Sequence, residues 1–143
     1  MKLTTYTDYS IRVLIYLGIN EDRICTSSEI SESYNISKNH LSKVIHQLSK
    51  LSLIDSFKGA SGGIKLALSP EEINIGKLVR QTEPDFHIVE CFAPSTNKCK
   101  ISPSCKLKQI LNESTSSFLN NLDKYTLKDI LSNSSRLEKL IKR

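Results

Sequence analysis

Residues 25–54, CTSSEISESYNISKNHLSKVIHQLSKLSLI, contain the pattern of two short amphipathic helices separated by a turn. A serine oxygen can accept a free N–H group of a first helical turn, so we expect Ser27 or Ser28 to cap the first helix. Asn35 tolerates a left-handed backbone and suits the turn, and Ser37 then caps the second helix. The apolar residues of that helix recur at helical spacing: Leu41, Val44, Ile45, Leu48 and Leu51. The stretch therefore predicts a helix-turn-helix.

A β-hairpin is expected directly after the second helix, because the period of the apolar residues changes there. Residues 53–68, LIDSFKGASGGIKLAL, place apolar side chains on both sides of a glycine-rich tip, GASGG. Such a pattern is typical of two short strands joined by a tight turn. A hairpin that follows a helix-turn-helix forms a wing, so these two stretches together predict a winged helix-turn-helix.

Helices are expected over most of the remaining chain. One covers about residues 7–18, another begins at Ser69 or Pro70 and stops before Pro84, and a long amphipathic helix covers residues 106–122. One or two further helical turns and a frayed basic tail follow it. The predicted fold class is mainly α with a small β-hairpin. The chain divides into a winged helix-turn-helix (1–84), a loop (85–105), and the long helix with a C-terminal tail (106–143).

The polar face of the second helix carries residue types that recognise DNA. The N-terminal turn of such a helix fits the major groove, where Asn and Gln can pair with adenine and Ser and Lys can bond bases or phosphates. Basic side chains beside a glycine tip can enter the minor groove. The predicted DNA-binding residues are Ser28, Ser37, Lys38, Asn39, His40, Ser42, Lys43, Gln47, Lys58, Ser61, Gly62 and Lys65. The alternative, a merely solvated helix face, is disfavoured because a wing follows the helix.

Composition and charge are those of an ordinary globular chain with a basic excess. Apolar residues make up 38% and charged residues 24% of the 143 residues, and the net charge is +5. Residues 98–143 carry ten basic against four acidic side chains, which is compatible with a polyanionic partner. Asp8 and Arg12 interrupt the apolar stretch near the N-terminus, so we expect no signal peptide, no membrane partner and a reducing cytoplasm. No histidine lies beside an evident nucleophile, so we expect no enzyme activity.

Three of the four cysteines lie within fifteen residues, in CFAPSTNKCKISPSC (91–105). In a reducing compartment such a group indicates metal binding or redox sensing more often than disulfides. Gaps of seven and five residues do not match the close pairs of structural zinc sites, but a loop can wrap widely spaced thiols around a cluster. Cys105 lies where Ser102 or Ser104 would cap the long helix, whose positive end favours the thiolate that binds iron. Spacing alone leaves cluster binding and spare thiols as equal alternatives, and the distant Cys25 is expected to be an ordinary small side chain.

A resemblance to one family extends over nearly the whole chain. It is carried, in order, by LTTYTDYSIRVLIYL, ISKNHLSKVIHQLSKL, KGASGGIKL, IGKLVRQTEP, CKISPSCKLKQIL and SFLNNLDKYTLKDI. These stretches are similar to the iron–sulfur winged-helix regulators, the family that includes IscR, and within it to nitric-oxide-sensitive repressors. The IscR branch has a histidine where this chain has Lys108, which argues against that branch.

The resemblance implies a homodimeric transcription repressor that binds a palindromic operator in double-stranded DNA and dimerises through the long helix. It implies that Cys91, Cys99 and Cys105 hold an iron–sulfur cluster, 4Fe–4S rather than 2Fe–2S, and that nitric oxide is the signal. Asp8 of the partner subunit is the implied fourth ligand, although an acid also suits the first turn of a helix without any metal. Two alternatives are a winged-helix regulator that senses through thiols or zinc, and a small iron–sulfur electron carrier.

Overall fold

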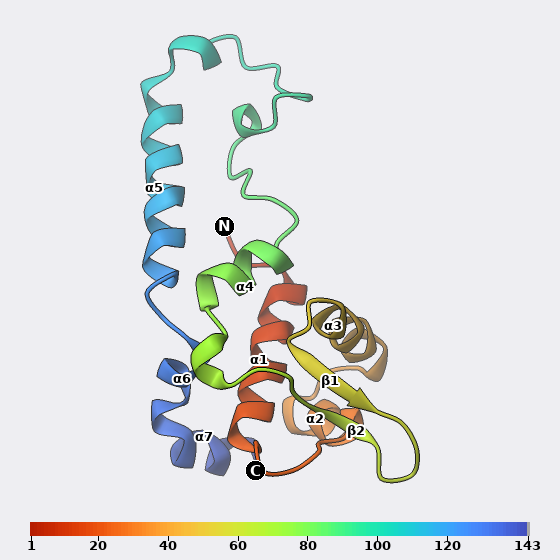
Figure 1. Ribbon diagram of the computed structural model, residues 1–143. Coiled ribbons are helices and arrows are strands. Elements are labelled where there is room, and N and C mark those ends of the chain that lie inside the picture. Colours follow the sequence, from red (N-terminus) through yellow and green to blue (C-terminus); the bar gives the residue numbers. More distant parts are fainter. Residues whose placement is uncertain (143) are drawn as a thin grey trace.

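The computed structural model describes residues 1–142 as a winged helix-turn-helix body from which one long helix projects (Figure 1). The helices are α1 (Thr5–Ile19), α2 (Ser27–Tyr34), α3 (Lys38–Lys50), α4 (Ile75–Thr82), α5 (Lys106–Leu122), α6 (Leu127–Ile130) and α7 (Ser134–Ile141). The strands are β1 (Ile54–Phe57) and β2 (Gly63–Leu66), and short 3-10 turns cover Pro70–Glu72, Glu90–Phe92, Ser102–Ser104 and Leu131–Asn133. The predicted fold class is confirmed. None of the helices in residues 1–142 is both long and apolar enough to cross a membrane.

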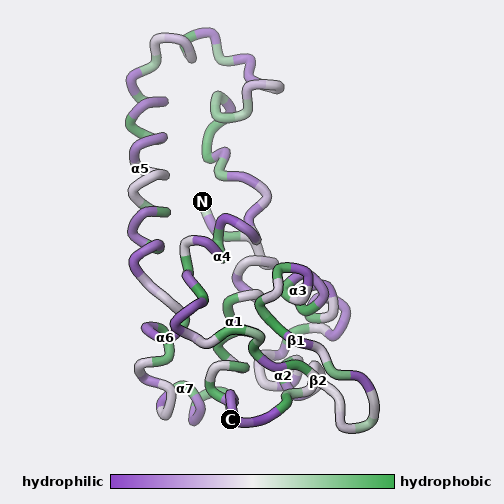
Figure 2. The backbone as a smooth tube through the Cα atoms, in the orientation of Figure 1, coloured by the Kyte–Doolittle hydropathy of each residue, from purple (hydrophilic) through white to green (hydrophobic). Residues whose placement is uncertain are grey.

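Helix α1 lies at the centre of the hydrophobic core. Its side chains Val13 and Leu14 are fully buried and Leu17 is almost so, and the helix packs against α3, β2, α4, α6 and α7. Figure 2 places hydrophobic stretches of α1, β1 and α3 next to one another. Thr4 caps α1 through its hydroxyl, which accepts the Thr7 N–H. Burial of the apolar face of α1 stabilises this body, because apolar surface is removed from water.

The helix-turn-helix has the predicted turn and second cap but a different first cap. Thr26 caps α2, whereas Ser27 or Ser28 was expected; both serines already lie inside the helix and cannot supply the residue before its first turn. Asn35 follows α2 in the left-handed conformation, with φ 53° and ψ 46°. Ser37 caps α3. The prediction is therefore confirmed for the turn and for α3.

The wing is an antiparallel hairpin in which Ile54 lies opposite Leu66. A third segment joins it, because the Cys25 N–H donates to Ile64 O at 2.9 Å and the Ile64 N–H donates to Cys25 O at 2.7 Å. A Cβ on Gly63 would collide with the Cys25 carbonyl, so the glycine permits this close approach. The segment that precedes α2 therefore attaches the wing to the helix-turn-helix.

The single helix expected after the wing is wrong, because the segment divides into the 3-10 turn Pro70–Glu72 and α4. Between them Ile73 is extended and buried, and its carbonyl accepts the Leu127 N–H at 2.8 Å. Asn74 forms an isolated β-bridge with Thr126 and caps α4 with its side chain. Backbone groups that pair with the C-terminal segment cannot also continue a helix.

Helix α5 has the predicted bounds and projects away from the body (Figure 1). Hydrophobic and hydrophilic residues alternate along it (Figure 2), and none of its residues is buried. The helix packs chiefly on α4, at its C-terminal end. Its apolar stripe therefore lacks cover within residues 1–142.

The chain after α5 returns to the core. Leu127 is fully buried, and Leu131 and Ile141 pack against the same cluster as α1. The helical turns expected after α5 are confirmed by α6 and α7, but the fraying expected of the basic tail is wrong up to residue 142, because α7 continues to Ile141, which packs against the core. Arg143, the last residue of the expected basic tail, lies outside the described residues. The hydrophobic core of the winged-helix body thus includes residues from both ends of the chain.

The contribution of the C-terminal segment to folding can be tested at Leu127. Since this side chain is fully buried, Leu127→Ala is expected to lower the free energy of unfolding by about 2–5 kcal/mol. Leu140→Ala is the matched control, because Leu140 is 56% exposed; its effect should stay within about 0.5 kcal/mol. Urea unfolding followed by circular dichroism measures both. Equal stability of the two variants would contradict the inclusion of Leu127 in the core.

Candidate nucleic-acid interface and cysteine loop

The outward face of α3 carries the side chains predicted to contact DNA. Leu41, Val44 and Leu48 are buried against the body, which leaves the opposite side of the helix free. Exposed residues at the start of α3 are Ser37, Lys38, Asn39, His40, Ser42 and Lys43. Gln47 is only partly exposed, and Ser28 lies partly exposed in the first turn of α2. The structure therefore brings six of the twelve predicted residues together at the exposed N-terminal end of α3.

The wing adds a second basic element. Lys58 and Ser61 are exposed, and Gly62 and Lys65 are partly exposed. The Gly62 N–H donates to Gly59 O at 3.0 Å, which closes the tip as a tight turn. Figure 1 shows the loop of the hairpin projecting from the body beyond α2. This geometry leaves the lysines of the hairpin accessible to a polyanion.

Asp8 makes an ion pair within its own helix. Its Oδ2 lies 2.8 Å from Arg12 Nη2, and Arg12 Nε donates to Asp8 Oδ1 at 3.2 Å. The Arg12 guanidinium also lies over the rings of Tyr9 and Tyr34, 5.7 and 5.9 Å from their centroids. The Tyr9 ring lies 6.5 Å from the ring of His40. Asp8 is therefore connected to α2 and α3 through side chains that contact one another.

Arg12 is a residue that the sequence-based site prediction missed. Its position four residues after Asp8 on a helix is the spacing of an ion pair, so this pair could have been predicted from the sequence. Its stacking on Tyr34, in another helix, could not have been predicted, because the two residues are distant in the chain. Burial raises the pKa of Tyr34 to about 12, so at neutral pH the guanidinium faces an uncharged phenol.

The three loop cysteines lie on the segment that leads from α4 to the far end of α5 (Figure 1). Cys91 lies in the 3-10 turn Glu90–Phe92, and Cys99 donates its N–H to Asn97 Oδ1 at 2.9 Å. Cys105 directly precedes α5. All three are free and partly exposed, whereas Cys25 is free and buried.

Cys105 itself caps α5, where Ser102 or Ser104 was expected. Its Sγ accepts the Lys108 N–H at 3.4 Å. The two serines belong to a separate 3-10 turn that ends before the helix begins, so neither is the residue next to its first turn. The sulfur therefore lies at the positive end of the α5 dipole.

The donor chemistry of the loop fits an iron–sulfur cluster, because accessible free thiols are the groups that hold such clusters. Within residues 1–142 of one chain, no three His, Cys, Asp or Glu side chains lie close enough to share a metal ion. Cluster binding would therefore require the loop to close around the group, as binding and local ordering are commonly coupled at metal sites.

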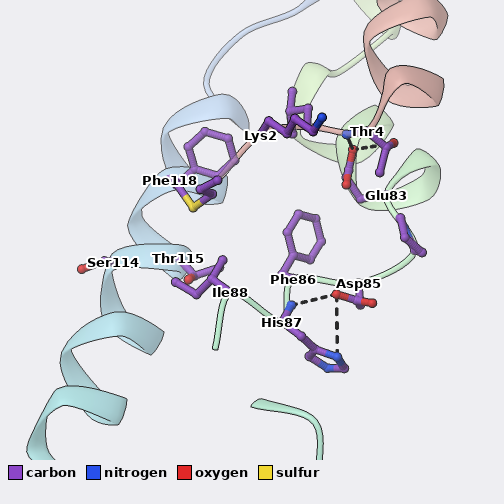
Figure 3. A pocket seen from close by; sticks show the side chains of 13 residues that line it. Lys2, Thr4, Glu83, Asp85, Phe86, His87, Ile88, Ser114, Thr115 and Phe118 are labelled. Carbon is purple, nitrogen blue, oxygen red and sulfur yellow. Dashed lines mark hydrogen bonds and ion pairs between the residues drawn. The ribbon is translucent and has the colours of Figure 1, made fainter. Parts of the chain in front are cut away.

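A cavity of about 630 Å³ lies between α5, the N-terminal residues and the segment that follows α4 (Figure 3). Glu83 Oε1 accepts the Thr4 N–H at 2.7 Å and the Thr4 hydroxyl at 2.9 Å, which joins the start of α1 to the end of α4. Phe86 and Phe118 supply apolar surface to the cavity. Because its walls are open and mainly apolar, the cavity suits contact with another protein surface better than it suits binding of a small ion.

The chain as a whole matches one family of known proteins. Residues 3–133 match the Rrf2 family, which is described as an iron-dependent transcriptional regulator. The chain belongs to the Rrf2 family. Membership confirms the resemblance found in the sequence. The protein is a transcriptional regulator and not an enzyme.

Individual relatives and solved structures agree with the Rrf2 assignment. The HTH-type transcriptional regulator NsrR of Bacillus subtilis (strain 168) is 51% identical over 143 residues, which cover 99% of this chain and 98% of that protein. The oxidized form of Staphylococcus aureus CymR superimposes with a TM-score of 0.73 at 27% identity, covering 92% of this chain and 97% of its own. T. potens IscR superimposes with a TM-score of 0.72 at 23% identity, covering 94% and 88%. The likeness to IscR shows the common fold.

The four cysteines are expected to differ in reactivity toward iodoacetamide. Cys25 is fully buried, and burial raises the pKa of its thiol to about 11. At about pH 8 it is therefore protonated, and the thiolate is the form that reacts. Mass spectrometry of the native, metal-free protein should show Cys91, Cys99 and Cys105 labelled well before Cys25, and urea should remove the difference. Equal labelling of Cys25 in the native protein would contradict its burial.

Proposed function

We propose that this chain is a homodimeric repressor that binds a palindromic DNA operator and senses nitric oxide through an iron–sulfur cluster. The observation that carries the proposal is the presence of two separate surfaces: the exposed polar face of α3 with the wing, and three free cysteines on the loop that leads to α5. A regulator needs one surface that binds DNA and a second site whose state alters that binding. Such a repressor acts in the cytoplasm, where its operator and a reducing environment are found.

DNA binding is supported by the side chains of α3 and the wing. Asn39, exposed in the first turn of α3, and Gln47 can each form paired hydrogen bonds with adenine in the major groove. Lys38 and Lys43 on the same helix, and Lys58 on the wing, can neutralise phosphates. Two such units related by a two-fold axis would bind an inverted repeat.

Dimer formation through α5 is supported by its uncovered apolar stripe. Leu107, Ile110 and Phe118 are 60%, 47% and 43% exposed, and large apolar side chains gathered on one helix mark an interaction surface. A second copy of α5 would bury them against its own stripe. The cavity behind α5 offers Phe86 as further apolar surface for the second chain (Figure 3).

We place a 4Fe–4S cluster on Cys91, Cys99 and Cys105, with Asp8 of the partner subunit as the fourth ligand. When bound, the cluster supplies iron with which nitric oxide reacts. A carboxylate is a harder ligand than a thiolate and binds such iron less firmly, so Asp8 is the weakest of the four ligands. Ligation by Asp8 would require its ion pair with Arg12 to open. Because Arg12 lies over Tyr34 of α2, a change at Asp8 would reach the helix-turn-helix.

Purification without oxygen tests the cluster. The wild-type protein is expected to absorb visible light and to contain iron and sulfide, whereas Cys99→Ala and Cys105→Ala should lose both, because each thiolate contributes a bond to the cluster. Cys25→Ala is the matched control, since Cys25 is buried apart from the loop. It should keep the wild-type iron content. Zinc in place of iron would favour the zinc-sensing alternative. A Cys105→Ala protein with a full complement of iron would contradict the assignment of the loop cysteines as ligands.

Substitution on α3 tests recognition of DNA. Asn39→Ala is expected to weaken binding to the operator by about 1–3 kcal/mol and to relax its specificity at one base pair, because a paired hydrogen bond to a base is lost. Asn133→Ala is the matched control, since Asn133 is exposed in the 3-10 turn Leu131–Asn133, outside α3 and the wing, and makes no side-chain cap hydrogen bond. Fluorescence anisotropy with operator and single-base variants measures both. If Asn39→Ala binds every duplex as Asn133→Ala does, the role assigned to Asn39 in base recognition is wrong.

A further inference from the structure

The direction of α5 is determined at one end of the helix. Within residues 1–142, α5 packs chiefly on α4, and the rest of it extends beyond the body (Figure 1). Helix α4 packs on α1, and α1 packs on α3. The angle between α5 and the recognition helix therefore depends on the junction where α5 ends and the chain returns to α4.

Asp123, the first residue after α5, is held by two residues of the α4 region. Its carboxylate makes two bonds with the Arg80 guanidinium, one of them between Oδ2 and Nη2 at 3.0 Å. Its carbonyl accepts from Asn74 Nδ2 at 2.7 Å. A planar guanidinium that meets a carboxylate through two parallel bonds restricts the angle between them, which a single bond would not do.

A glycine on α4 permits this contact. A Cβ at Gly76 would collide with the Asp123 carboxylate and would lie 2.8 Å from the Asp123 nitrogen. Backbone pairing continues beyond the junction, because the Ile75 N–H donates to Tyr125 O at 3.0 Å and the Leu127 N–H donates to Ile73 O at 2.8 Å. The end of α5 is thus held against α4 by side chains and by main chain.

We propose that Arg80 and Asp123 are positioning residues that set the angle of α5 and thereby the separation of the two DNA half-sites that the dimer binds. The proposal rests on the proposed function, in which α5 forms the dimer. A helix of 17 residues is about 25 Å long, so a tilt of about 10° at its base moves its far end by about 4 Å. This displacement exceeds the 3.4 Å rise of one base pair. A loosened junction would therefore allow the winged helices to bind half-sites at several separations.

Binding to duplexes of altered spacing tests the proposal. The probes are a duplex selected by the wild-type protein from a random pool, the same duplex with its half-sites moved by one or two base pairs, and a single half-site. The wild type should lose on the order of tenfold in affinity for each shifted duplex. For Arg80→Gln and Asp123→Asn the loss should fall to about threefold or less, because the angle is no longer restricted. Affinity for the single half-site should not change.

Lys128→Gln is the matched control. It removes another exposed ion pair, 2.6 Å to Glu71, that joins α6 to the 3-10 turn Pro70–Glu72 without involving α5. It should keep the wild-type spacing profile. Exposed ion pairs contribute little to folding stability, so all three variants should stay folded and dimeric by circular dichroism and sedimentation.

Two results would overturn the role of Arg80 and Asp123. One is a spacing profile of both variants that superimposes on that of the wild type; the other is loss of the fold or of the dimer in both, since the pair would then be structural. A wild type that is monomeric, or that binds every spacing equally, would instead overturn the proposed dimer on a palindrome. Failure of the positioning role is thus distinguishable from failure of the proposed function.

Discussion

Helix α1 packs against α3, β2, α4, α6 and α7, and its side chains Val13, Leu14 and Leu17 are fully or almost fully buried as a result. Short helices and a two-stranded hairpin are marginal on their own in water, so these elements depend on packing against one another and on α1. The arrangement has a direct consequence for the site. Asp8 and Arg12 lie on the partly exposed side of the helix that supports the helix-turn-helix, and the Arg12 guanidinium lies over Tyr34 of α2. A change at the N-terminus of α1 therefore has a short physical route to the surface that we propose contacts DNA.

The cysteine loop and the elements that we propose contact DNA lie in differently built parts of the molecule. Helix α3 is held by a buried apolar face. The loop is instead stabilised mainly by hydrogen bonds between residues close in the chain, such as that from the Cys99 N–H to Asn97 Oδ1. Segments with few buried apolar contacts open and reorder easily. This difference suits a protein in which one part must present side chains in a constant geometry and another must adapt to a cofactor. Helix α5 joins the two parts, and Leu107, Ile110 and Phe118 on it are exposed.

Sequence patterns predicted the elements well wherever the decisive residues are neighbours. The turn at Asn35, the cap at Ser37 and the bounds of α5 each depend on side chains within about one helical turn of the backbone they control. The wrong predictions of longer segments depend on residues far apart, whereas the wrong caps of α2 and α5 concern neighbouring residues, with Thr26 and Cys105 as the observed caps. Ile73 interrupts a helix because its carbonyl accepts the Leu127 N–H, and the C-terminal segment is ordered because it packs on α1. The residues that we propose contact DNA could be named from their positions on one face of a predicted helix, and the loop cysteines from their grouping.

The amino-acid sequence by itself determined the helix-turn-helix and wing, the long amphipathic helix and the grouping of three cysteines on one loop. Periodicity, caps and turn residues act locally, so they need no knowledge of the rest of the chain. Only the tertiary structure decided that Arg12 connects Asp8 to α2 and that Asp123 joins α5 to α4 through Arg80. The contacts of Arg12 and Asp123 join side chains distant in the chain, and their formation depends on how buried α1 brings the surrounding elements together. The direction of α5, on which the proposed dimer depends, was also decided only by the tertiary structure. Helical periodicity specifies which face of a helix is apolar, but it does not specify the angle between that helix and its neighbours.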